Sequence, residues 1–147
     1  MEYFSDTLKA NGYLKIPFKI SKTQHLLIKA SINGIKGSFI LDTGASNSCV
    51  GFEGIELFGL HAKTSAKKAA GAGAVGMQTQ ISTDNSLQIN RWKSSKFDLV
   101  IFDMSHVNTA LQEYGITAIH GIIGADVLLK GQAIIDYYHC HLYLKKL

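Results

Sequence analysis

An aspartate directly follows a run of large apolar residues in the segment Phe39-Ile40-Leu41-Asp42-Thr43-Gly44. The apolar run predicts a buried strand, and an ionised carboxylate at the end of such a strand is costly unless it is paired or hydrogen-bonded. Gly44 permits close backbone approach, and its amide can donate a hydrogen bond to the carboxylate. A carboxylate held in this way can transfer protons in catalysis. We interpret the segment as a chemical site.

The alternative is that Asp42 only caps the turn after the strand, as aspartates often do. For the three letters Asp-Thr-Gly alone this structural reading is the better one, since the tripeptide occurs by chance in many chains. The surroundings favour a site, because an Asn-Gly hairpin lies upstream and a second apolar element lies downstream.

The second element is Ile122-Ile123-Gly124, which follows Asp42 by about 80 residues. Two β-branched residues followed by a glycine predict a buried strand that ends in a sharp turn, where the chain packs closely against the backbone of a neighbouring segment. A short helix is expected at 125–130, closed by Gly131. On its own, this junction would be read as structural.

The remaining elements that must position these residues are mostly strands. Leu26–Ile32 and Lys36–Leu41 are expected to form a hairpin around Asn33-Gly34. A helix capped by Ser105 is expected to reach about Tyr114. Further strands are expected at 13–20, 77–82, 87–92, 97–102, 133–138 and 141–144, with a polar turn at 93–96 and an ambiguous segment at 52–60. The fold class expected is mainly β, a small closed β-barrel with one or two short helices.

Together the two motifs resemble those of retropepsin-like aspartic proteases, which are homodimeric relatives of one pepsin lobe. The resemblance extends from about Tyr13 to Leu144 and implies that Asp42 is catalytic. It implies that Thr43 braces the partner's loop across the two-fold axis and that Gly44 packs under the catalytic pair. Support of this loop is implied for Ile122, Ile123 and Gly124, and substrate binding for Ala45 and Ser46.

The family places a mobile hairpin flap over the substrate between these motifs. Residues 66–80, with Gly71, Gly73 and Gly76 at their centre, occupy that part of the sequence. Glycines allow hinge motion and close approach of backbone amides to a peptide. The three glycines are therefore assigned to substrate binding, with an ordinary surface loop as the alternative.

Two departures from the retroviral pattern affect the active loop. Ser46 stands where retroviral members usually carry Asp, and Ala125 stands where they carry Arg. Those charges brace the loop and the dimer, so other contacts must replace them here. Ala45 also lacks the hydroxyl that pepsin-like enzymes often place after the glycine, which predicts a less acidic pH optimum.

The activity implied is endopeptidase hydrolysis by an Asp42 dyad formed across a homodimer, acting on a peptide or protein substrate. One chain supplies one carboxylate, and this chemistry needs two. No metal, cofactor or covalent intermediate is expected. The rival hypothesis is a retropepsin-fold dimer that binds peptides or protein tails without cutting them, since a fold does not fix function.

Length and composition suit one domain over residues 1–147, with residues 1–12 as an N-terminal extension that is either removable or packed on the barrel. The net charge of +4 comes with scattered lysines, so no nucleic-acid partner is expected. Neither a signal segment nor an apolar run of membrane-spanning length is present, so a cytoplasmic protein without a membrane partner is expected. Cys49 and Cys140 are too few for a disulfide framework, and the sequence leaves open whether they are bridged.

The sequence disfavours three other chemistries. Residues 71–76 match GxGxxG, but the polar segment before them and the strand-like segment after them are wrong for a dinucleotide site. His139 and His141 would share one face of a strand, yet no further zinc ligands stand at a suitable spacing. No GxSxG nucleophile elbow is present.

Overall fold

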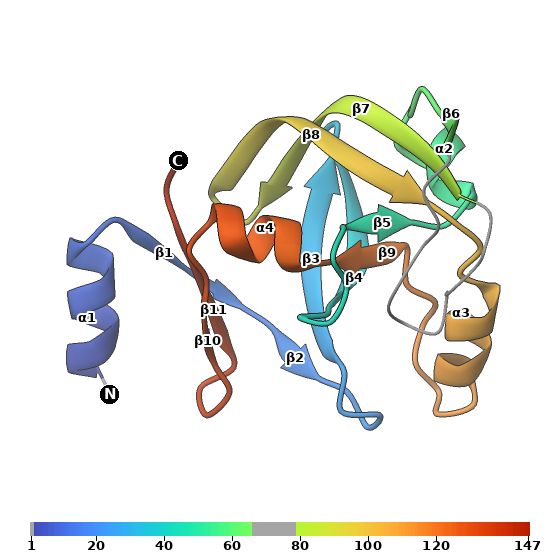
Figure 1. Cartoon of the computed structure of the whole chain (residues 1–147). Helices are drawn as coiled ribbons and strands as arrows, with labels where there is room; N and C mark the ends of the chain where they lie inside the picture. Colours follow the sequence, from blue (N-terminus) through green and yellow to red (C-terminus); the bar gives the residue numbers. More distant parts are fainter. Residues whose placement is uncertain (1, 66–78) are drawn as a thin grey trace.

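The computed structural model describes residues 2–65 and 79–147 and is mainly β (Figure 1). Its helices are α1 (Glu2–Ala10), α2 (Glu53–Leu57), α3 (Ser105–Gln112) and α4 (Ala125–Lys130). Its strands are β1 (Tyr13–Pro17), β2 (Lys19–Ile20), β3 (Leu26–Ile32), β4 (Ile35–Leu41), β5 (Cys49–Val50), β6 (Lys63–Ser65), β7 (Thr79–Ile89), β8 (Trp92–Ile101), β9 (Gly121–Ile123), β10 (Ile134–Asp136) and β11 (His141–Lys145). Among the described residues, no helix has the length and apolar character needed to cross a membrane.

Six strands close into a barrel in the order β3, β4, β9, β5, β8 and β7, and β7 pairs back onto β3. The closing seam is short, with Ser31 opposite Gln88 and Ile32 opposite Leu87. Strand β2 extends the sheet beyond β3, and β6 extends it beyond β7. The expected closed β-barrel is confirmed.

The hairpin between β3 and β4 forms around Asn33-Gly34 as expected. Both residues have positive φ, 51° and 84°, which is the requirement of a two-residue type I′ turn. The turn pairs Ile32 with Ile35 and sets the register down to Leu26 opposite Leu41. Local turn chemistry thus fixes where β4 ends, immediately before Asp42.

Strand β9 pairs in parallel with the last three residues of β4, Phe39–Leu41, and both three-residue segments are buried on both faces. Phe39, Leu41 and Ile123 belong to the core cluster inside the barrel. Ile40 and Ile122 belong to a second cluster, which also holds residues of the segment 102–119 around α3. Burial on both faces explains why the end of β4 and β9 read as continuous apolar runs.

A second, three-stranded sheet in the order β1, β11 and β10 joins the two ends of the described chain. Helix α1 lies beside this sheet (Figure 1), and the Phe4 ring meets the Tyr143 ring edge-on at a centroid distance of 6.1 Å. Residues 2–10 therefore pack on the sheet as an additional helix, which the strand-dominated reading of the sequence did not anticipate. Helix α2 lies in the segment whose pattern was ambiguous.

Two local predictions were wrong. The β7–β8 hairpin turns at Asn90-Arg91, where Asn90 adopts a φ of 55°, and not at 93–96. The polar segment 93–96 stays in the strand because Ser94 is buried and accepts a 2.6 Å hydrogen bond from Lys130 Nζ. At the start of α3, Ser105 is the first residue of the helix and not its cap, and its N–H donates to the Asp103 carboxylate at 2.8 Å.

Candidate active site

Asp42 lies one residue beyond the parallel pair formed by Leu41 and Ile123. Its N–H donates to the Ile123 carbonyl at 2.9 Å, so the β4–β9 ladder holds its backbone. Its side chain is half-buried, and Oδ1 accepts the Gly44 N–H at 2.8 Å. The hydrogen bond from the glycine amide is the one the sequence led us to expect.

The loop after Asp42 exposes Thr43, Gly44 and Ser46 and buries Ala45. The hydroxyls of Thr43 and Ser46 have no hydrogen-bond partner within residues 2–65 and 79–147. A Cβ on Gly44 would lie 3.3 Å from Asp42 Oδ1, so glycine leaves room for the carboxylate. The loop therefore combines a fixed carboxylate with free hydroxyls at the surface.

The end of β9 supports this loop from behind. The Ala125 N–H donates to the Ala45 carbonyl at 2.7 Å. A Cβ on Gly124 would lie 2.6 Å from the same oxygen, which real atoms do not tolerate. The structure thus places Ile123 and Gly124 beside the Asp42 loop, whereas Ile122 pairs with Ile40 and Cys49.

Two further residues of the site were missed in the sequence. Ser48 is fully buried, and its Oγ donates to Asp126 Oδ1 at 2.7 Å while accepting the Gly124 N–H at 2.9 Å. The Ser48 N–H donates to Asp126 Oδ2 at 2.9 Å. Because the two residues lie 78 positions apart, no local pattern could have shown this link.

Cys49 is the first residue of β5 and lies within electrostatic reach of two carboxylates. Burial raises the pKa of its thiol to about 12, and the nearby charges of Asp126 and Asp42 act in the same direction, against a hydrogen bond with the Ile122 backbone. Cys49 is therefore a neutral packing residue. Cys140 is partly exposed, and neither cysteine is bridged.

The assigned flap glycines, Gly71, Gly73 and Gly76, lie outside the described residues, as does the GxGxxG match. His139 and His141 do share a face, with parallel rings whose centroids are 6.4 Å apart. His139 Nδ1 contacts Asp136 Oδ2 at 2.8 Å, and within the described residues no group of three potential ligands could hold a metal ion.

Comparison with known proteins agrees with this geometry. Residues 28–127 match the family model described as aspartyl protease. This match covers β3 to α4, including both motifs, and the chain belongs to this aspartyl protease family. The search of curated protein sequences gave no match.

Solved structures of the same fold include a retropepsin-like aspartic protease from Rickettsia conorii, with a TM-score of 0.64 and 18% identity over 91% of this chain and 92% of that one. The retroviral protease-like domain of Ddi1 from Leishmania major has a TM-score of 0.57 and 18% identity over 84% and 90% of the two chains. The EIAV protease in complex with an inhibitor has a TM-score of 0.57 and 15% identity over 80% and 98%. The fold is therefore that of the retropepsin-like aspartic proteases.

Proposed function

We propose that the chain is an aspartic endopeptidase in which Asp42 and the same residue of a second copy form the catalytic dyad. The observation that carries the proposal is the half-buried Asp42 carboxylate, fixed by the Gly44 amide at the end of β4. Membership of the aspartyl protease family supports the assignment. We further propose that residues 1–147 act as one domain.

The chemistry follows from bringing two like carboxylates together. Two aspartates that face each other closely cannot both ionise, so one proton is shared and the apparent pKa values belong to the pair. The ionised member takes a proton from a held water, which attacks the peptide carbonyl. The protonated member donates a hydrogen bond to the developing oxyanion and then assists protonation of the leaving nitrogen.

The loop residues take supporting roles in this proposal. Thr43, whose hydroxyl is exposed, would brace the partner's loop, and Gly44 would pack beneath the dyad. Ala45 and Ser46 would line the substrate groove, with Gly71, Gly73 and Gly76 covering it. The contacts of Ser48 with Asp126 supply bracing that Ser46 and Ala125 cannot supply by charge.

A second candidate is a dimer that binds peptides without cutting them. It is favoured by the uncharged Ser46 and Ala125, which leave the loop without the ionic bracing of the retroviral enzymes. The intact Asp-Thr-Gly loop favours catalysis, because a binding module has no use for paired carboxylates in a half-buried position.

Peptide-library cleavage between about pH 3 and 8 tests the proposal. The assay compares the wild type with Asp42→Asn and with the control Asp98→Asn, which changes an exposed carboxylate on β8. Thermal melting first verifies that each variant is as stable as the wild type. We expect the wild type and the control to cleave peptides, with the highest cleavage rate above about pH 3. A statine-type inhibitor should block this cleavage, and Asp42→Asn should show none. A folded dimeric wild type that binds library peptides and cuts none would replace the protease by the binding module.

A further inference from the structure

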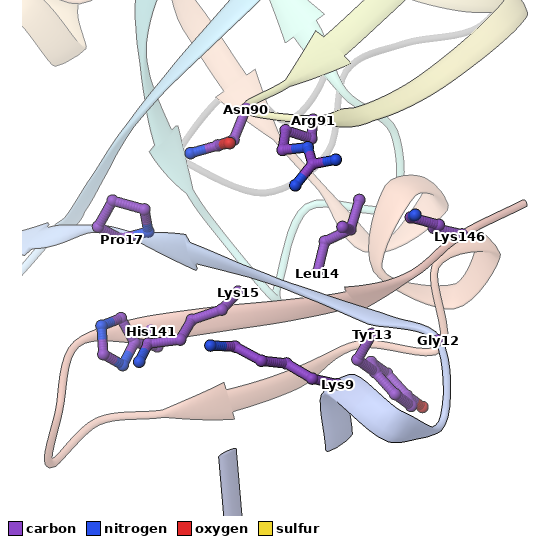
Figure 2. Close-up of a pocket in the computed structure, with 10 residues that line it drawn as sticks. All are labelled: Lys9, Gly12, Tyr13, Leu14, Lys15, Pro17, Asn90, Arg91, His141 and Lys146. Atoms are coloured by element: carbon purple, nitrogen blue, oxygen red, sulfur yellow. The ribbon is translucent and has the colours of Figure 1, made fainter. Parts of the chain in front are cut away.

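A basic hollow lies between the three-stranded sheet and the tip of the β7–β8 hairpin (Figure 2). It has a volume of about 580 Å³ and no acidic residue in its lining. Four exposed cations from four separate segments border it: Lys9 of α1, Lys15 of β1, Arg91 of the hairpin turn and Lys146 after β11. Leu14, Tyr13 and His141 contribute half-buried surface.

Hydrogen bonds to the backbone hold the segments that carry these cations. The Trp92 indole N–H donates to the Lys145 carbonyl at 3.0 Å, which places the neighbouring Arg91 and Lys146 on one rim. The Lys146 N–H donates to the Gly12 carbonyl at 3.0 Å, close to the end of α1. The Gln88 amide donates to the Asn90 carbonyl at 2.9 Å and fixes the turn before Arg91. The rim is therefore built before any ligand arrives.

The four cations are not neutralised by the part of the chain that the structure describes, where none of them forms an ion pair. An adjoining hollow that shares Lys9, Lys15 and His141 contains Asp6 and Asp136, but the Asp136 carboxylate contacts His139. The lysines also act on His141, whose pKa is lowered by burial and by the charges of Lys15, His139 and Lys9, against the opposing charge of Asp136. Gathering like charges around one hollow is unfavourable unless an anion joins them.

We propose that this hollow is a binding site for a small molecule that carries several phosphate groups. Its volume falls within the range of small-molecule sites, about 300–1,000 Å³. Figure 2 shows Arg91 and Lys146 on one side of β1 and Lys9 and Lys15 on the other, and four cations around one hollow call for several negative charges on the ligand. The planar guanidinium of Arg91 suits bidentate contact with phosphate oxygens, and lysines serve as point charges around it. Asn90 adds a neutral hydrogen-bonding group at the rim.

This site is separate from the proposed catalytic loop, because neither Asp42 nor any residue of 43–48 lines the hollow. The proposal goes beyond the proteolytic function and does not depend on it. Its test reads binding alone, so a failed protease assay leaves it standing.

The experiment is calorimetric titration of the full chain with inorganic tripolyphosphate at about 50 mM salt, where screening is modest. The test variant is Arg91→Gln/Lys146→Gln. The control is Lys93→Gln/Lys96→Gln, which removes the same charge from exposed positions of the same hairpin that do not line the hollow. Urea unfolding of both variants verifies that each is folded.

We expect one tripolyphosphate per chain, affinity reduced about tenfold or more in the test variant, and a change below about threefold in the control. A parallel titration with adenosine triphosphate tests whether the site recognises more than the phosphates. Equal affinity for adenosine triphosphate and tripolyphosphate means that only the phosphates are recognised, whereas tighter binding of adenosine triphosphate points to a nucleotide. Equal losses of tripolyphosphate affinity in both variants would show that binding depends only on net charge, and would overturn the proposal. No binding by the wild type, or tighter binding of a poly-glutamate peptide than of tripolyphosphate, would also overturn it.

Discussion

At the scale of single residues, the buried Ser48 hydroxyl links the segment that follows Asp42 to α4. It donates to Asp126 Oδ1 and accepts from the Gly124 N–H. Ser48→Ala leaves a buried donor and a carboxylate oxygen without their partner, at a cost of about 1–3 kcal/mol. We expect the free energy of unfolding in urea to fall by that amount. Ser46→Ala, at an exposed position of the same loop, should stay within about 0.5 kcal/mol, and equal effects of the two changes would contradict the bracing role.

The thiol of Cys49 gives a pH dependence that can be measured on the folded chain. Its folded pKa of about 12 lies above the ordinary value of 9.0, so the folded state keeps its proton where the unfolded state has lost it. The contribution of the Cys49 thiol to the free energy of unfolding is therefore fully present below about pH 9. It decreases as the pH rises from there towards 12. We expect urea unfolding at pH 8, 9 and 10 to show a shallower decline for Cys49→Ala than for the wild type.

The matched variant for this measurement is Cys140→Ala, which removes the partly exposed thiol. It should decline with pH as steeply as the wild type, because it keeps Cys49, whose pKa is raised by burial. Parallel curves for all three proteins would show that Cys49 titrates normally.

At the scale of elements, the approach of β5 to β9 depends on a glycine. A Cβ on Gly121 would overlap the Cys49 carbonyl oxygen, and backbone cannot move aside as a flexible side chain can. Gly121→Ala should force the two strands apart and lower the unfolding free energy by about 3 kcal/mol or more.

Gly34→Ala is the matched control for that substitution. Nothing lies within 4 Å of a Cβ there, so only the left-handed backbone, with φ of 84°, resists the change. A cost of about 1–2 kcal/mol is expected. Chemical denaturation of both variants compares the two costs, and a Gly121→Ala protein as stable as Gly34→Ala would rule out the steric account.

The same elements show what could be read from the sequence. Asn33-Gly34 and the apolar strands before Asp42 and Gly124 were predictable because turn chemistry and burial act locally. The sequence predicted the turn at 93–96 instead of at Asn90-Arg91. The polar residues at 93–96 misled the prediction because Ser94 is hydrogen-bonded to the distant Lys130.

The candidate site shows the same limit. The hydrogen bond from Gly44 to Asp42 is local, and we anticipated it, whereas the link between Ser48 and Asp126 joins distant positions. The basic hollow was equally hidden, since its cations come from four segments that read as scattered lysines and one arginine.

At the scale of the whole molecule, the proposed dyad requires two chains, and mixing tests this directly. Asp42→Asn added to the wild type at fixed total protein should form mixed dimers with a single aspartate. We expect cleavage to follow the square of the wild-type fraction, so that an equal mixture keeps about a quarter of the activity. Dilution of the wild type with buffer to the same fraction is the control. A linear decrease to one half in the mixture would mean that each chain works alone.

The pairing of β1 with β11 has a consequence for biosynthesis. All five residues of β1 are matched to β11, Tyr13 with Lys145 through Pro17 with His141, so an early strand finds its partner only at the other end of the sequence. At about 5–20 residues per second, a ribosome needs roughly 6–30 s to deliver that partner. Until then the backbone groups of β1 that later face β11 have no strand to pair with, and they are open to a neighbouring nascent chain on the same messenger RNA.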